Sequence, residues 1–282
     1  MRTMNKLVML IALLVCIPGY AQRKVSIIVP PPGYVRHETD SYGTYLRNLP
    51  LKRPGSPVML YNGVEKGYQD GAYAVIDMEI GNSDLQQCAD AVMRLRAEYL
   101  WHSKQYDKIH FNFTNGMRVD YSKWAQGYRI KVSGNNTSWY KASSEDYGYI
   151  TFRKYMDQIF MYAGTASLSK ELIPVEPSDI RVGDIFIIGG HPGHAMVIVD
   201  MAEDKLGNKA VLVAQSYMPA QSIHIVTNLS VDFCFLKSEG FYEDEEECYN
   251  KSVKTGSFGN CLTHEHGGGD FALCFGLAAN CF

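Results

Sequence analysis

Apolar positions recur at helical spacing through residues 85–101, which predicts an amphipathic helix. Ser83 and Gln86, three positions apart at the start of this segment, have the arrangement of a helix capping box. The apolar positions follow at steps of three and four residues: Leu85, Cys88, Ala89, Val92, Leu95, Tyr99 and Leu100. We therefore expect a helix that begins near Ser83 and carries Cys88 on its buried face. With Ser83 as the cap, Cys88 lies five residues in, where the effect of the helix dipole has largely decayed, whereas a cap at Asp84 or Gln86 would restore that effect.

A second helix and several short strands follow from the same kind of pattern. Residues 149–163 are rich in aromatic and aliphatic residues and end at Gly164, which predicts a helix. A run at 72–80 ends in a Gly-Asn pair and fits a strand. Further runs rich in β-branched residues, separated by turn residues, lie at 185–188, 194–200 and 210–215. These last three runs predict a compact antiparallel sheet.

The order of these elements indicates an α+β fold, in which the Cys88 helix packs on a small antiparallel sheet. Residues 22–57 are rich in Pro, Gly and Tyr and predict an extended N-terminal arm. Residues 58–240 predict a single domain, interrupted at about 102–148 by a loop-rich insertion with one short helix. Residues 241–282, rich in Cys and Gly, are expected to form an atypical tail.

Residues 1–21 have the features of a cleavable signal peptide. A basic start precedes an apolar run at 7–18, and the segment ends at a small residue. A lipid anchor on Cys16 is disfavoured, because Val15 stands where a small residue is expected. No later run approaches the roughly 18 apolar residues of a membrane span. We therefore expect an exported protein, periplasmic or extracellular, without a membrane span.

Composition excludes one class of partner. The chain carries 27 Lys and Arg against 30 Asp and Glu, for a net charge of −3, and the two signs are well mixed. A protein that neutralises phosphates needs a basic face, and the sequence shows none. The hydrophobic fraction of 46% is enough to fill a globular core. We therefore expect a globular protein that does not bind nucleic acid.

Cysteine usage separates Cys88 from the other cysteines. Six cysteines remain after removal of the signal peptide, and five of them crowd toward the C-terminus: Cys234, Cys248, Cys261, Cys274 and Cys281. In an oxidising compartment these five allow two disulfides with one cysteine left over. Their spacing with His264 and His266 fits no standard zinc pattern, so we predict neither a metal site nor a cofactor. Cys88 remains as a lone thiol.

Cys88, His194 and Gln215 have the residue types of a cysteine nucleophile site. A helix N-terminus and an adjacent imidazole lower a thiol pKa, and a third polar group orients the imidazole. His194 opens a predicted strand after a glycine-rich turn, and Gln215 lies on the next strand. A hairpin turn centred on Asp204-Lys205 places His194 opposite Gln215, whereas a turn centred on Gly207-Asn208 separates them by several pairs.

The order of these motifs resembles that of the NlpC-type papain-like hydrolases. The matching segments are Gln87-Cys88-Ala89, Gly183-Asp184-Ile185-Phe186, residues 193–199 and Ala214-Gln215-Ser216. The resemblance implies a papain-like fold with Cys88 as nucleophile, His194 as general base and Gln215 as the residue that orients the imidazole. It also implies hydrolysis of an amide bond in a peptide or cell-wall-derived substrate. The chain departs from these hydrolases in having Gln87 and Ala89 where they usually have Asp and Ser.

Residues 28–228 also resemble an uncharacterised family of exported bacterial proteins, catalogued as a domain of unknown function (the DUF4846 family). The likeness rests on the segments 84–92, 95–100 and 214–221. It implies export and brings no established activity.

A non-catalytic interpretation of the same residues is also open. A lone cysteine on the apolar stripe of a helix is typical of a packed core residue. The protein would then be an envelope protein that binds a peptide or glycan in the same groove. Trp124 and Trp139 could stack on such a ligand, although large aromatic residues also pack in cores. His191, in the Gly-Gly-His-Pro-Gly loop, is a second candidate for contact with Cys88 or with a ligand.

Overall fold

The fold is taken from a computed structural model, which describes residues 22–227, 234–236 and 276–279. The helices are α1 (Ser41–Arg47), α2 (Cys88–His102), α3 (Tyr121–Ala125), α4 (Tyr149–Tyr162) and α5 (Thr165–Glu171). The strands are β1 (Ala72–Val75), β2 (His110–Asn112), β3 (Arg118–Asp120), β4 (Tyr128–Ser133), β5 (Asn136–Lys141), β6 (Ile173–Pro174), β7 (Ile185–Ile188), β8 (His194–Glu203), β9 (Lys209–Gln215), β10 (His224–Val226), β11 (Cys234–Leu236) and β12 (Gly276–Ala279). The protein is therefore of mixed α+β class.

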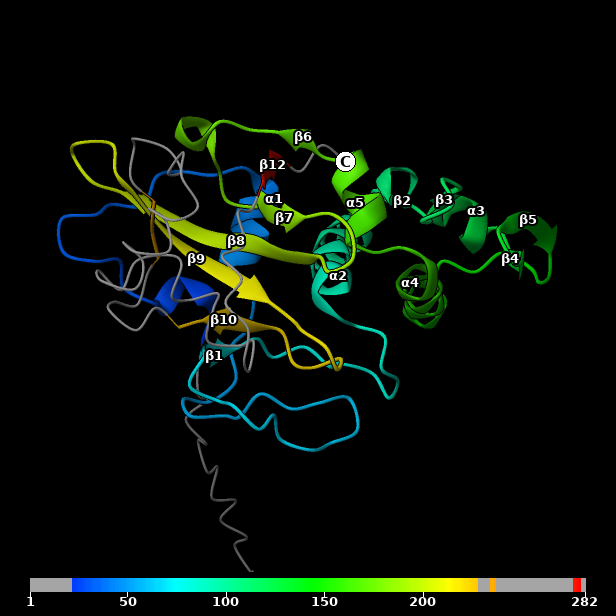
Figure 1. The fold of residues 1–282 in the computed structure, drawn as a ribbon, viewed down its shortest axis with the longest axis horizontal. Coiled ribbons are helices and arrows are strands. Elements are labelled where there is room, and N and C mark those ends of the chain that lie inside the picture. Colours follow the sequence, from blue (N-terminus) through cyan, green and yellow to red (C-terminus); the bar gives the residue numbers. More distant parts are fainter. Residues whose placement is uncertain (1–21, 228–233, 237–275, 280–282) are drawn as a thin grey trace, which may run out of the picture.

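An antiparallel sheet of eight strands forms the centre of the molecule (Figure 1). Its strand order is β1-β10-β9-β8-β7-β12-β6, and β11 also pairs with β9. The three runs predicted as neighbouring strands are confirmed as β7, β8 and β9. Strand β12 comes from the segment predicted as a tail and pairs with β7 and β6.

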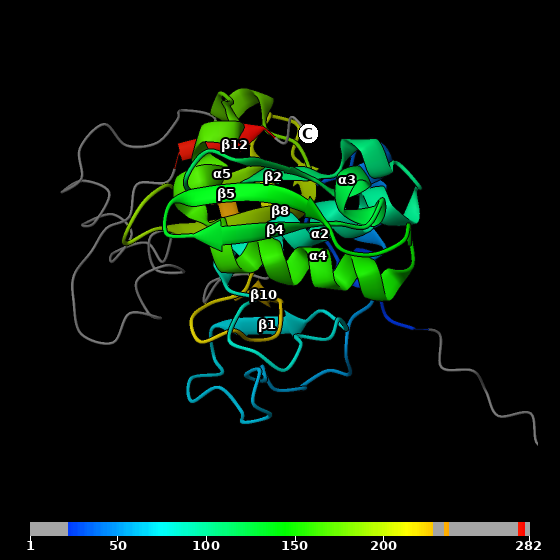
Figure 2. The ribbon, with the colours of Figure 1, turned by 90° about the vertical axis from the view of Figure 1, so that its right-hand side faces the viewer.

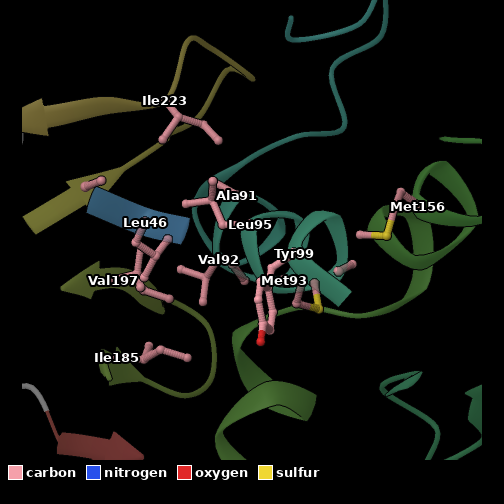
Figure 3. Close-up of a cluster of buried hydrophobic side chains, with 14 of the residues drawn as sticks. Leu46, Ala91, Val92, Met93, Leu95, Tyr99, Met156, Ile185, Val197 and Ile223 are labelled. Atoms are coloured by element: carbon pink, nitrogen blue, oxygen red, sulfur yellow. The ribbon is translucent and has the colours of Figure 1, made fainter. Parts of the chain in front are cut away.

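Helix α2 is buried between the sheet and helix α4 (Figures 1 and 3). Val92 and Leu95 of α2 belong to the same buried cluster as Val197 of β8, and Met156 of α4 closes the other side of the helix. Burial of one such aliphatic side chain stabilises a fold by about 1.5 to 3 kcal/mol. The apolar stripe read from the sequence therefore does face the sheet, and the remaining faces of α2 are covered as well.

Segment 22–57 contains more structure than the predicted extended arm. It carries α1, which packs against β8 and α2 and begins where Asp40 Oδ1 accepts a hydrogen bond from the Gly43 backbone N–H at 2.7 Å. The Nε atoms of Arg36 and Arg47 lie 2.6 and 2.7 Å from the carboxylate of Asp200, whose side chain is fully buried in β8. Two cations thus stabilise one buried anion and attach this segment to the sheet.

The predicted insertion lies beyond α2 and α4, away from β8 and β9 (Figures 1 and 2). Its one predicted helix is α3. The expectation of loops elsewhere in the insertion is wrong, because it also contains the hairpins β2-β3 and β4-β5. In β4-β5, a turn at residues 134–135 joins six paired positions on each strand, and few of these side chains are buried. A hairpin of this kind has a weak apolar alternation, which is why its pattern resembles a loop.

Several predictions lie outside the described residues. They concern the signal peptide at 1–21 with Cys16, and the cysteines of the tail from Cys248 onward. Among the residues that are described, no helix has both the length and the apolar character needed to cross a membrane.

Candidate active site

Cys88 is the first residue of helix α2. The expected start near Ser83 is wrong, because the residue before the helix is Gln87, whose backbone N–H donates to Asp90 Oδ2 at 3.0 Å. The capping contact therefore joins Gln87 and Asp90 rather than Ser83 and Gln86. At the first helical position the backbone N–H groups are unpaired within the helix, and the helix dipole favours negative charge. The helix therefore stabilises the thiolate form of Cys88 more than it would if it began at Ser83.

The Cys88 side chain lies beside the first residues of strand β8. Burial raises the pKa of the thiol, since only 8% of the residue is exposed. A hydrogen bond from the Ala195 backbone N–H opposes this and lowers the pKa, as does one from Ala89, while the charge of Asp90 raises it. Because Ala195 directly follows His194, the contact brings the sulfur to the strand end that carries the imidazole.

His194 and Gln215 are joined by a short hydrogen bond. The Nε2 atom of His194 lies 2.7 Å from Gln215 Oε1, and both side chains are buried. Neither of the two registers considered is found, because Val197 pairs with Ala214 and Gln215 therefore comes opposite Met196. Glu203 pairs with Lys209, so the turn is centred on Leu206, midway between the two turns considered. His194 and Gln215 remain on one face as diagonal neighbours, and a glutamine side chain is long enough to span that separation.

A second histidine, His224, lies behind Gln215. It pairs with Gln215 across strands β9 and β10, is fully buried, and places its Nε2 atom 3.4 Å from Gln215 Nε2. Its Nδ1 atom lies 3.1 Å from the backbone carbonyl oxygen of Ser222. His224 was not among the residues predicted from the sequence. The available signal was a histidine at the start of an otherwise apolar strand.

The segment before α2 is attached to the loop after β9. The Ser216 hydroxyl lies 3.0 Å from the backbone carbonyl oxygen of Gln86 and 2.9 Å from that of Gln221, and these two acceptors share its one hydrogen. The backbone N–H of Ala220 donates to Asp84 Oδ1 at 2.6 Å. These contacts link the residues just before Cys88 to those just after Gln215. The helix start and the strand end are therefore held together by buried hydrogen bonds.

Asp90 is a buried acid in the first turn of α2. Its carboxyl is 6% exposed, and burial raises its pKa to about 8, while the bond from Gln87 lowers it. No cation forms an ion pair with Asp90 among the residues that the structure describes. At neutral pH the carboxyl is therefore mostly protonated, and a neutral Asp90 does not oppose a thiolate at Cys88.

The other predicted ligand-binding residues lie apart from this group. Trp124 is 4% exposed, and its indole N–H donates to the Thr151 carbonyl at 3.1 Å, so the expectation of an exposed stacking ring is wrong. Trp139 lies half-buried on β5, with the Lys123 ammonium 5.0 Å from its ring centroid. His191 is exposed in the loop between β7 and β8.

A cavity of about 380 Å³ lies along the second half of α2. Its acidic and basic lining residues are Asp77, Glu79, Arg94, Glu98 and His102. Arg94 is fully buried and bonds the carboxylates of Glu79 and Glu98 at 2.8 and 3.3 Å. Cys88 does not line this cavity. The ion-pair network of Arg94 is thus separate from the thiol of Cys88, although Arg94 also donates to the side chain of Gln86.

These features define an α+β protein in which a buried thiol at the start of a helix lies beside the strand end that carries a hydrogen-bonded imidazole and amide. The chain belongs to the family described as a domain of unknown function (4846), whose profile matches residues 25–250. Comparison with curated proteins and with solved structures gave no significant match.

Proposed function

We propose that this protein is an exported cysteine hydrolase that cleaves an amide bond through Cys88, His194 and Gln215. The observation that carries the proposal is the buried 2.7 Å hydrogen bond between His194 and Gln215. The backbone N–H of Ala195, the residue after His194, bonds the Cys88 sulfur, so the thiol lies at the same strand end. A nucleophile, a base and an orienting group are the components that such catalysis requires. The position of Cys88 at the start of a 15-residue helix adds to the support.

In the proposed mechanism, His194 accepts the thiol proton of Cys88 as the sulfur attacks the carbonyl carbon of the substrate. The backbone N–H of Cys88, at the helix N-terminus, would donate to the oxyanion. The imidazolium then returns the proton to the departing amine, leaving a thioester. Water, deprotonated by the same imidazole, hydrolyses the thioester and restores the thiol. Gln215 holds the ring through both steps.

A papain-like arrangement and a peptide substrate belong to this proposal. The order of elements, a cysteine-bearing helix followed by strands that carry the histidine and the glutamine, supports the papain-like arrangement. The signal-peptide features of residues 1–21 support export, periplasmic or extracellular. A peptide of the cell wall is the substrate class that an exported amidase of this type would meet, and this step rests on analogy.

The second candidate is a non-catalytic envelope protein that binds a peptide or glycan in the same groove. The burial of Cys88, which raises the pKa of its thiol, favours this candidate. Cys88 would then be a small core residue, and the His194–Gln215 pair would be a satisfied buried contact.

Alkylation of Cys88 distinguishes the two. Iodoacetamide is added to the full protein at pH 6.5, and mass spectrometry follows the peptide that contains Cys88, so that the other cysteines do not interfere. A hydrolase should show fast labelling that falls by about 100-fold in His194→Ala, because the base is lost. His110→Ala, which changes a half-buried histidine of β2, is the matched control and should leave the rate unchanged. A slow rate that is equal in all three proteins would support the binding protein.

A further inference from the structure

We propose that His224 is a positioning residue that sets the orientation of the Gln215 amide and, through it, decides which ring nitrogen of His194 carries the proton. The inference deepens the proposed function, on which its catalytic consequence rests. It starts from the buried row His194, Gln215 and His224, which spans strands β8, β9 and β10.

The backbone carbonyl of Ser222 locates the proton of His224. A carbonyl oxygen only accepts hydrogen bonds, so the His224 Nδ1 atom, 3.1 Å from the Ser222 oxygen, must carry a proton. In a neutral imidazole the other nitrogen then has a lone pair. The Nε2 atom of His224 is therefore an acceptor, and it faces the amide of Gln215.

An acceptor at His224 selects one of the two orientations of the Gln215 amide. With its NH2 group toward His224, the amide donates across the 3.4 Å contact, and its oxygen faces His194. In the reversed orientation, the amide oxygen and the His224 lone pair would face each other in a buried site, which leaves two polar atoms unsatisfied. The 3.4 Å bond is long, so its importance lies in the choice of orientation rather than in bond strength.

The amide oxygen in turn determines the tautomer of His194. An oxygen only accepts, so the short 2.7 Å contact requires that His194 Nε2 carry the proton. The neutral ring then keeps its lone pair on Nδ1, the nitrogen that is not engaged with Gln215. A general base needs a free lone pair toward the thiol, so the His224 acceptor prepares the ring for that role.

The test combines nuclear magnetic resonance with alkylation of Cys88. In the wild-type protein, ¹⁵N-edited spectra of the histidine rings should show a proton on Nε2 of His194 and on Nδ1 of His224. In His224→Leu, which removes the acceptor, His194 should populate both tautomers. Labelling of Cys88 should slow by about 10-fold, the lower end of the cost of losing an outer partner of a metal-bound histidine, because only the tautomer with its lone pair on Nδ1 can accept the thiol proton. His224→Gln, which restores an acceptor at this position, should recover both the tautomer and the rate.

Other outcomes overturn the inference. A wild-type spectrum with the proton on Nδ1 of His194 would do so, as would a His224→Leu protein with unchanged tautomer and labelling. His110→Leu is the matched control and should change neither. The wild-type spectrum needs no variant, so it can overturn the inference even if His224→Leu does not fold. If wild-type Cys88 fails to react, the proposed function fails, while the two ring tautomers still test the role of His224.

Discussion

The two halves of helix α2 bury polar groups in different ways. In the second half, the fully buried Arg94 bonds Glu79 and Glu98, and Tyr149 donates to Glu98 at 2.8 Å. Opposite charges compensate one another there. In the first turn, Asp90 has a raised pKa and no ion-pair partner among the described residues, beside the buried thiol of Cys88.

This difference separates a structural network from a candidate chemical site. In a buried ion pair both groups stay charged, and removing one of the two partners is strongly destabilising. A buried group without a counter-charge instead shifts its pKa, and shifted pKa values concentrate at functional sites. The Arg94 network thus stabilises the fold, and the first turn of α2 is where titration is expected.

The largest effect is expected from Arg94→Met. Loss of the guanidinium leaves Glu98, which is 2% exposed, without its cation. The free energy of unfolding should fall by about 3 to 5 kcal/mol, measured by urea denaturation. Arg118→Met, which removes an exposed pair with Asp120, is the control and should cost less than about 1 kcal/mol. Equal losses in the two variants would contradict the structural role of the Arg94 network.

A smaller effect, with a pH signature, is expected from Asp90→Asn. The folded-state pKa of Asp90 is about 8, far above the ordinary value of 3.8, so the folded state binds the proton more tightly than the unfolded state. The contribution of Asp90 to the free energy of unfolding is therefore fully present below about pH 4 and is lost as pH rises toward 8.

Urea denaturation at pH 5 and pH 8 measures this dependence. In the wild-type protein the free energy of unfolding should fall between pH 5 and pH 8. In Asp90→Asn this fall should be smaller by about 1 to 3 kcal/mol. Glu171, whose pKa burial raises to about 7, contributes equally to both proteins and cancels in the comparison. An identical pH dependence in wild type and variant would show that Asp90 does not titrate in this range.

The smallest effect is expected from Trp139→Ala. The change removes the contact with the Lys123 ammonium, and part of the packing of Trp139 against the hydrophobic core, on a hairpin that lies away from β8 and β9. Stability should fall by about 1 to 2 kcal/mol, from the lost cation–π contact and the lost apolar burial. Labelling of Cys88 should not change. If labelling slowed as much as in His194→Ala, the hairpin would have to take part in the site.

Much of the site could be predicted because its signals are local. Polar residues inside apolar strands marked His194 and Gln215, and the helical spacing around residue 88 marked the cysteine. The register of β8 and β9 was predicted less well. It depends on a five-residue turn in which Asp204 Oδ1 accepts the backbone N–H groups of Leu206 and Asn208, and several turns of similar length fit that sequence.

The residue pattern alone was enough to place Cys88 in a helix next to a sheet that carries His194 and Gln215. Where that helix begins depends on a contact distant in sequence, because Asp84 bonds Ala220, 136 residues away, and does not cap α2. Long-range contacts also buried Trp124 and brought His224 behind Gln215. The physical reason is that periodicity reflects neighbours three or four residues apart, whereas a buried polar group takes its partners from whichever strand the folded chain places beside it.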